Sequence, residues 1–513
     1  MIGNRRKTSV ARGFAGETRE SLAGVQQCAA ALPGAGPGGG LCCQGRLADA
    51  LEQYKANGCP GRQTTMIGSK TVSRRGALKL AAAATALPLV HIRTAGAAGK
   101  VSIGFWDHWV PGGNDVMQKQ VNAWANKNKV EVQADFITGN GNKLSLTAAA
   151  EGEAKAGHDA LTYYNWDVHN FADSLEPIDD VMGRLIAANG AVNKTCSYLA
   201  HTKRGWVAVP TSSGTQTKPP CARISWFGKH GLDLQAMYPA HPGATPQQAD
   251  WTWETFRKYA ALAQQDGMTF GLGLGGGTNT DATDLHGALF RSFGAMLIDS
   301  EGTIQLHSPE MQQVMEFARG LVKYYPNDAV SFDDASNNRA LISGKSALIF
   351  NPPSAWAVAK RDAPKVAADC WTFPAPKGPK GRFVPTASFF WGVHNFSPNK
   401  TAAKELIEYL MQRPQVEERC NVVDGYDLPP YASLLDFKIW ETVEPPKGTV
   451  YNYPIRPWHQ QEPNLTASEA SPDVAVQIYN RAVHNQIMAR IREGESDKQV
   501  LAWAQDEIEG YLR

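Results

Sequence analysis

The main part of this 513-residue sequence lacks the basic clusters that a nucleic-acid-binding protein needs. Residues 98–513 contain 38 lysines and arginines against 45 aspartates and glutamates, a net charge of −7, whereas residues 1–97 contain 13 against 4. Nucleic-acid phosphates are held by clustered lysine and arginine side chains. The acidic main part is therefore not expected to bind nucleic acid.

Catalytic, metal-binding and nucleotide-binding motifs are also missing. The sequence contains no H-E-x-x-H, G-x-S-x-G or C-x-x-C spacing, and its twelve histidines are scattered. Gly271–Gly276 fits the dinucleotide pattern G-x-G-x-x-G, but Thr278-Asn279-Thr280 follows it, and we expect a flexible loop between domains here. Gly344-Lys345-Ser346 lacks the earlier glycine of a phosphate loop, where Arg339 stands instead. We expect no cofactor, no metal and no enzymatic activity.

Cysteine is sparse and shows no compact disulfide framework. Four cysteines lie in the leading segment and four in the main part; the latter are Cys196, Cys221, Cys370 and Cys420. In an oxidising compartment these four could pair in three ways, and buried free thiols explain them equally well. Both alternatives stay open on the sequence.

No apolar run near the start reaches the about 20 residues of a membrane span. Residues 81–90 are a short apolar run that follows Arg74 and Arg75 and precedes small residues near Ala97, the order of a signal peptide. Ser73–Lys79 resembles the twin-arginine export signal. We expect residues 66–98 to be this signal, starting at Met66, and the protein to be periplasmic. Residues 1–65, rich in glycine and proline, are expected to be disordered or a misassigned extension.

Short apolar strands alternate with amphipathic helices after the signal, which predicts a parallel α/β sheet. The first expected elements are strands at 100–106, 130–136 and 159–164 and helices at 115–126 and 144–156. Thr252 is expected to cap a further helix. Later elements are strands at 346–350 and 389–394, helices at 311–325 and 402–411, and two closing helices at 474–491 and 500–512.

Aromatic and polar residues gather where these strands end. The clusters are Trp106–Trp109, Tyr164–Asp167, Trp356 after Asn351, and Phe389–Gly392. Ligands of open α/β sheets bind beyond the carboxyl ends of strands. Flat aromatic faces beside aspartate, asparagine and threonine suit the C–H faces and hydroxyls of a sugar. The clusters therefore predict a sugar site, with core packing as the alternative for each single tryptophan.

Several runs resemble bacterial extracellular solute-binding proteins, in particular the maltose-binding-like, sugar-specific class. They are the export signal, the strand ending in Phe105-Trp106, residues 157–179, and Ala208–Pro210. Trp251–Phe256 resembles the family's TW-x-x-F helix start, and Gly344–Asn351 with Trp356 resembles its second-lobe strand and loop. The resemblance covers residues 100–513. Lys218–Trp226 departs from the usual tyrosine-asparagine-lysine strand, so the hinge geometry is not carried over.

The resemblance implies an α/β, two-lobed periplasmic-binding-protein fold with a hinge and an interlobe ligand cleft. The solute-binding domain would span 99–513, with a first lobe mainly at 99–210 plus a later returning segment, a second lobe mainly at 220–400, and closing helices at 402–513. The residues expected at the ligand are Trp106, Trp109, Asn165, Trp166, Asp167, Thr211, Asn351, Trp356, Phe390 and Trp391.

The function implied is that of the solute-binding component of an ABC importer. A monomer would deliver a sugar or polyol to a membrane permease whose ATPase is a separate chain. Two alternatives remain open: a sensor for a membrane receptor, and an exported glycan-active enzyme, for which Asp107 and Asp167 are the only candidate carboxylates. A cationic ligand is a further alternative, because aromatic boxes with aspartate also bind cations.

Overall fold

The computed structural model describes residues 99–239, 245–276, 279–449 and 455–513. The chain divides into two units, residues 1–81 and 82–513, and every described residue belongs to the second unit. The expected export signal with Arg74 and Arg75, and the extension before it, lie outside the described residues. These expectations therefore stay predictions.

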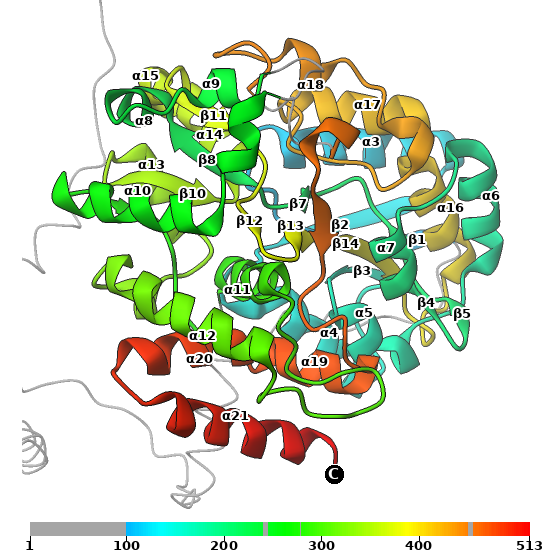
Figure 1. The fold of residues 1–513 in the computed structure, drawn as a ribbon. Helices are drawn as coiled ribbons and strands as arrows, with labels where there is room; N and C mark the ends of the chain where they lie inside the picture. The colour runs from blue at the N-terminus through cyan, green and yellow to red at the C-terminus, as the bar shows by residue number, and fades with distance from the viewer. Residues whose placement is uncertain (1–98, 240–244, 277–278, 450–454) are drawn as a thin grey trace, which may run out of the picture. The chain divides into compact units, whose positions relative to one another are not determined.

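The first of two main sheets has five strands in the order β2-β1-β3-β14-β6 (Figure 1). They are β1 (Lys100–Trp106), β2 (Glu131–Ile137), β3 (Ala160–Tyr164), β6 (Val209–Pro210) and β14 (Phe389–Val393). β1 is parallel to β2 and β3, whereas β14 is antiparallel to β3 and β6. The three parallel strands agree with the expected ranges to within one residue. β1 and β3 are largely buried apolar runs, as is typical of parallel strands covered on both faces, whereas β2 alternates in sequence and lies at the edge of the sheet.

Helices from two distant parts of the chain cover this sheet or pack against the helices that cover it. They are α3 (Gly113–Asn128), α4 (Lys143–Ala154), α6 (Asp179–Asn189), α16 (Lys400–Leu410) and α17 (Arg413–Val422). Helix α4 contacts β3, and α16 contacts β1, β14 and α3. We call the first sheet with these helices the first lobe. It includes β14, α16 and α17 from later in the chain, where a returning segment was expected; the expected lobe bounds stay a prediction.

The second main sheet has four strands in the order β11-β8-β10-β9. They are β8 (Pro220–Arg223), β9 (Thr269–Phe270), β10 (Ser346–Phe350) and β11 (Cys370–Thr372). Strand β10 has the predicted bounds, and it pairs antiparallel with β8 and parallel with β9. Helix α10 (Trp253–Gln265) begins where expected, because the Thr252 side chain accepts a hydrogen bond from the backbone N–H of Thr255.

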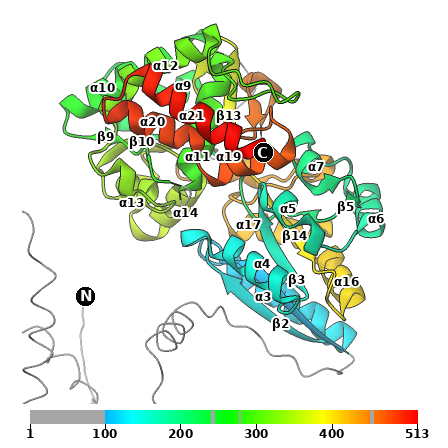
Figure 2. The ribbon, with the colours of Figure 1, turned by 90° about the horizontal axis from the view of Figure 1, so that it is seen from below.

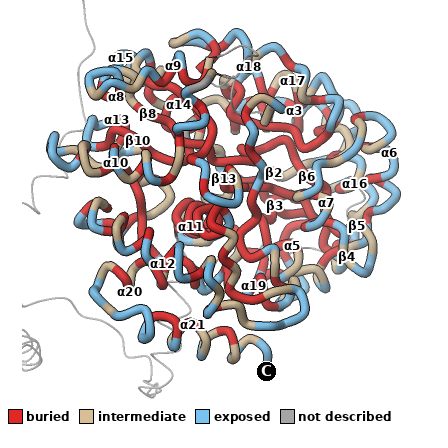
Figure 3. The backbone as a smooth tube through the Cα atoms, viewed as in Figure 1, coloured by how far each residue is buried: buried red, intermediate tan, exposed pale blue. Residues whose placement is uncertain are grey.

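Further helices complete what we call the second lobe (Figure 2). They are α11 (Thr280–Phe293), α12 (Pro309–Leu321), α13 (Ser336–Ile342) and α14 (Pro352–Asp362). Nearly every residue of α11 is buried (Figure 3). Helix α11 contacts α12, and α13 and α14 lie beside β10 and β8 respectively. With two α/β lobes, the described residues confirm the expected fold class.

Short strands join the two lobes. Along the chain, strand β7 (Gln216–Thr217) comes after β6 of the first sheet and before β8 of the second. It pairs with β13 (Gly381–Ala387). Strand β13 leads through Ser388 into β14 and also pairs with β12 (Lys377–Gly378) and β15 (Glu462–Asn464). These crossing strands are where a hinge between the lobes would bend.

The closing helices differ from the expected two. Residues 474–491 form two helices, α19 (Pro472–Asn480) and α20 (Val483–Arg492), and α21 (Asp497–Tyr511) follows. The expected single helix was wrong because Ala482 adopts a left-handed conformation with φ of 49°. This break allows α19 to contact α5 and α20 to contact α11 and α12. Both pieces keep the same apolar periodicity, so the sequence pattern does not show the break.

The remaining helices and strands are short. They are α5 (Asp167–Asn170), α7 (Lys194–Ala200), β4 (His201–Thr202), β5 (Gly205–Trp206), α8 (Ile224–Lys229), α9 (Leu234–Met237), α15 (Pro364–Ala367) and α18 (Ile439–Thr442). Among the residues that the structure describes, no helix is long and apolar enough to cross a membrane.

Candidate functional site

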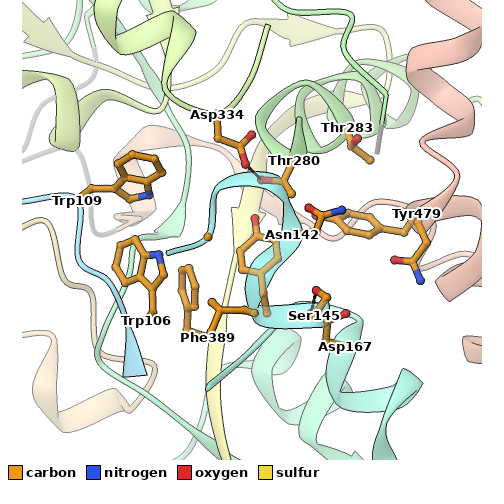
Figure 4. A pocket seen from close by; sticks show the side chains of 14 residues that line it. Trp106, Trp109, Asn142, Ser145, Asp167, Thr280, Thr283, Asp334, Phe389 and Tyr479 are labelled. Atoms are coloured by element: carbon orange, nitrogen blue, oxygen red, sulfur yellow. Dashed lines mark hydrogen bonds between the residues drawn. The ribbon is translucent and has the colours of Figure 1, made fainter. Parts of the chain in front are cut away.

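A cavity of about 90 Å³ lies beyond the carboxyl ends of β1 and β3 (Figure 4). Its lining comes from both lobes. Trp106 ends β1 and Asp167 follows β3 in the first lobe, whereas Thr280 begins α11 and Asp334 precedes α13 in the second. In Figure 4 the two tryptophans lie on one side and Tyr479 on the other. This is the position at which open α/β sheets bind ligands.

One wall of the cavity is aromatic. The Trp106 ring stacks on Phe389 with 4.6 Å between ring centroids and an interplanar angle of 26°, and Tyr164 lies 4.9 Å from Phe389 on its other flank. The backbone N–H of Trp106 donates to the Thr162 hydroxyl at 3.2 Å, which fixes the end of β1. Trp109 is only partly buried. The wall therefore offers fixed apolar faces suited to C–H groups.

A carboxyl group of the first lobe lines the cavity from α5. Asp167 is 7% exposed, and its Oδ2 accepts a hydrogen bond from the Ser145 hydroxyl at 2.5 Å. Burial raises the pKa of Asp167 to about 6, and the hydrogen bonds from Ser145 and the backbone partly oppose this rise. Asp167 can therefore accept hydrogen bonds from a ligand hydroxyl.

A buried charge cluster supports the opposite side. The Lys218 ammonium lies 2.7 Å from Asp281 Oδ1 and 2.8 Å from Asp284 Oδ2, and the Tyr164 hydroxyl donates to the same Asp284 oxygen at 2.9 Å. Lys218 belongs to the crossing segment after β7, Tyr164 ends β3, and both aspartates lie on α11. The cluster thus ties the first lobe to the second directly behind the cavity.

Asp334 extends this cluster into the cavity. Its Oδ2 accepts a hydrogen bond from the Thr280 hydroxyl and its Oδ1 from the backbone N–H of Asp281, both at 3.1 Å. Burial and then the negative charge of Asp281 raise the pKa of Asp334 to about 7, against the attraction of Lys218. Asp334 is only partly buried, so its carboxyl group is accessible from the cavity.

Three of the ten predicted ligand residues line this cavity, namely Trp106, Trp109 and Asp167. Two others lie just behind it. Asn165 donates to the Tyr479 hydroxyl at 3.3 Å, and Asn351 donates to Asp281 Oδ2 at 3.3 Å. Both asparagines have left-handed backbones, with φ of 40° and 88°, a conformation that asparagine tolerates better than most residues. They position cavity residues rather than line the cavity.

The other five predicted residues are buried elsewhere. The indole N–H of Trp166 donates to the Thr466 carbonyl oxygen and that of Trp356 to the Pro445 carbonyl oxygen. The Thr211 hydroxyl is bonded to the Ser213 backbone, and Phe390 and Trp391 are 0% and 1% exposed within the core. The ten-residue assignment stays a prediction, and the cavity supports the three that line it.

Some lining residues were not in the predicted set. They are Gly139, Asn142, Leu144, Ser145, Tyr164, Thr280, Thr283, Asp334, Phe389, Tyr479 and Asn480. Tyr164 and Phe389 stand in aromatic clusters that the sequence showed at strand ends, so a signal existed for them. Asp334 follows Asp333 in a turn before α13, where the Asp333 carboxylate accepts a hydrogen bond from the Ser336 hydroxyl at 2.5 Å. Nothing local distinguishes Tyr479, which reaches the cavity from the C-terminal part.

Other chemistry has little support in the described part of the chain. No group of three histidine, cysteine or carboxylate side chains there could hold a metal ion. Cys196, Cys221, Cys370 and Cys420 are all buried free thiols, in agreement with one of the two alternatives. Asp107 is exposed, and its carboxylate accepts from Asn114 at 2.7 Å. It does not line the cavity with Asp167.

Comparison with known proteins gives consistent results. Residues 111–417 match the family model described as "Bacterial extracellular solute-binding protein". No curated protein sequence matches the chain. Among solved structures, maltose-bound MalE3 of T. maritima superposes with a TM-score of 0.63 at 19% identity, over 80% of this chain and 99% of that one.

Two further structures show the same fold. A sugar transporter from Arthrobacter chlorophenolicus with bound laminaribiose has a TM-score of 0.62 at 16% identity, covering 81% of this chain and 100% of that chain. An ABC transporter solute-binding protein from Agrobacterium vitis with bound D-mannitol has a TM-score of 0.59 at 19% identity, covering 81% and 98%. At these identities the likeness establishes the two-lobed fold.

Proposed function

Because this chain belongs to the bacterial extracellular solute-binding proteins, we propose that it captures a sugar or related polyol for an ABC importer. The observation that carries this proposal is the cavity at the ends of β1 and β3, which combines an aromatic wall with hydroxyl, amide and carboxyl groups from both lobes. Solved structures of the same fold hold maltose, laminaribiose and D-mannitol. Stacking would recognise the C–H faces of a ring, and the polar groups its hydroxyls.

The proposed mechanism is a shift between open and closed arrangements of the lobes. Ligand that contacts both the Trp106 wall and the Thr280–Asp334 side favours the arrangement in which these groups converge. Bending would occur in the crossing strands β7 and β13. A membrane permease would recognise the closed form, and its separate ATPase would hydrolyse ATP, so this chain would bind no nucleotide and catalyse no reaction.

The proposal includes export by the twin-arginine route and action as a monomer in the periplasm. A reporter fused after residue 98 tests the route. Replacing Arg74 and Arg75 by lysine should keep the reporter in the cytoplasm, whereas continued export would show that another route operates.

The direct test is thermal unfolding of the full chain with a panel of sugars, polyols, polyamines and amino acids, with tryptophan fluorescence recorded in parallel. A ligand at 100 times its Kd stabilises the folded state by about 2.7 kcal/mol. A rise of several degrees with one polyhydroxy class, without product formation by mass spectrometry, supports the proposal. No rise with any sugar or polyol, or turnover of a glycan, contradicts it.

A further inference from the structure

The side chains around the cavity carry more negative than positive charge. Four carboxyl groups belong to the cavity or its support, namely Asp167, Asp281, Asp284 and Asp334, against the single ammonium group of Lys218. Among the described residues, no lysine, arginine or histidine lines the cavity. Carboxylates in a partly buried site need a compensating cation or a proton.

Lys218 attracts Asp334 but forms no direct ion pair with it, so it compensates this carboxyl group only in part. Its ammonium group is 2.7 and 2.8 Å from Asp281 and Asp284, and its side chain is 5% exposed. Within the described part of the chain, Asp334 and Asp167 form no ion pair with a nitrogen within 4.0 Å; Asp334 has only a hydroxyl and a backbone N–H as partners. Oδ1 of Asp284, a residue 1% exposed, also has no hydrogen-bond partner there. A positive charge is thus missing from this side of the cavity.

The aromatic wall can stabilise a cation as well as a sugar face. Ammonium groups are attracted to aromatic rings within about 6 Å of the ring centroid. The protein already contains this arrangement, because the Lys218 ammonium lies 5.6 Å from the Tyr164 ring centroid while it is bound by two carboxylates. Tyr164 also lines the cavity. A ligand ammonium beside Asp334 would meet the same two kinds of group.

Metal ions and simple polyamines fit the cavity less well than a cation that also carries hydroxyl groups. The described residues contain no three-ligand group for a metal ion, which favours an organic cation. The cavity of about 90 Å³ is small compared with the roughly 300–1,000 Å³ of sites for drug-sized ligands, so a compact ligand is favoured. Asn142, Ser145 and Thr283 offer groups for hydroxyls, which a simple polyamine lacks.

From this geometry we infer that the ligand is a compact amino sugar or amino polyol, whose protonated amine binds the Asp334 carboxylate between the two lobes. The inference rests on the proposed function and narrows its ligand class. Neutral sugars would occupy the cavity without the charge contact and bind more weakly. Sugar phosphates and sugar acids would be excluded by repulsion from Asp167 and Asp334.

The test is calorimetric binding to the full chain of matched pairs that differ in a single amine. The probes are glucose with glucosamine, galactose with galactosamine, mannose with mannosamine, and glucitol with 1-amino-1-deoxyglucitol; N-acetylglucosamine serves as the uncharged control. A charge-assisted contact predicts that one amine binds about 10- to 100-fold more tightly than its hydroxyl partner. Acetylation should remove this advantage.

Two variants connect the preference to Asp334. Asp334→Asn should remove most of the preference for the amine, measured as the ratio of the affinities for the amine and for its neutral partner. Asp333→Asn is the matched control, because the Asp333 carboxylate pairs with Arg339 at 2.9 Å and does not line the cavity. It should retain the preference.

Each outcome distinguishes the inference from the proposed function. If a neutral sugar or polyol binds and its amine binds no better, the ammonium inference is overturned and the proposed function stands. If the Asp334→Asn variant prefers amines over their neutral partners as strongly as the wild type does, the assigned carboxylate is wrong and the inference is overturned. If no polyhydroxy compound binds, the proposed function is overturned, and the inference that rests on it is overturned with it.

Discussion

Removing the Lys218 ammonium should destabilise the protein strongly. The Lys218→Met variant keeps most of the side-chain volume and leaves two buried carboxylates, Asp281 and Asp284, without their cation. Breaking a buried pair in this way costs about 3–5 kcal/mol. With about 2 °C per kcal/mol for a domain of this size, Tm should fall by roughly 6–10 °C. Differential scanning calorimetry of the wild type and the variant at pH 7.5 measures this shift.

The effect of Lys218→Met should depend on pH with a defined sign. Burial raises the pKa of Asp284, and Lys218 opposes that rise, so loss of the ammonium raises this pKa further. A carboxyl group with a raised folded-state pKa costs stability as the pH rises from its unfolded-state pKa to its folded-state pKa, so the further rise in the variant adds a cost only above the wild-type pKa. The difference in Tm between the wild type and the variant should therefore shrink between pH 8 and pH 5.

A matched surface variant separates this effect from the general loss of a lysine. Lys229 pairs with Asp266 at 3.4 Å, and its side chain is 69% exposed. Such a pair contributes about 0–1 kcal/mol, so Lys229→Met should change Tm little. Adding Asp284→Asn to Lys218→Met should restore part of the lost stability. Equal, small shifts for both lysine variants, or no pH dependence, would refute the reasoning.

Three further predictions concern the cavity and the thiols. Trp106→Ala should weaken binding of the sugar identified in the panel by about 10- to 100-fold in calorimetry, whereas Trp503→Ala, on α21 and outside the cavity lining, should leave affinity unchanged. Because the pKa of Asp334 is raised to about 7, the ionisation of this group costs stability as pH rises from about 4 to 7. The Asp334→Asn variant should therefore have a higher Tm than the wild type at pH 8 but not at pH 4. Parallel curves of Tm against pH for the two proteins would contradict the raised pKa. The four described cysteines should react with a thiol reagent only after unfolding, because all of them are buried. Peptide mapping would locate any cysteine that reacts rapidly in the native protein, and such a reaction would show that its burial is wrong.

Local pattern was enough to predict several elements of both lobes, including β1, which ends at the cavity. β1 and β10 have the predicted bounds, and Thr252 caps α10 as expected. Each of these features depends on neighbouring residues alone: an apolar run, its end, or a hydroxyl three residues before a free backbone N–H. The rule that ligands bind beyond strand ends then identified Trp106 and Asp167, which line the cavity.

The tertiary structure decided which of the tryptophans at strand ends face the cavity. Trp106 ends β1 and Trp166 lies two residues after β3, but the left-handed turn at Asn165 directs Trp166 to the Thr466 carbonyl in the core. Strand alternation distinguishes two faces of a sheet without showing what covers each face. The partner of Trp166 lies 300 residues away in sequence.

By itself, the sequence pattern predicted an α/β fold with aromatic and polar groups at the carboxyl ends of its strands, and the resemblance to solute-binding proteins implied its two lobes. Only the tertiary structure placed Lys218 between Asp281 and Asp284, more than 60 residues away, and brought Asp334 and Tyr479 to the same cavity. The physical reason is the distance along the sequence over which each interaction acts. Hydrogen-bond periodicity and capping act within a few residues and are written in local pattern, whereas the charge balance of a site depends on which distant segments the fold packs together.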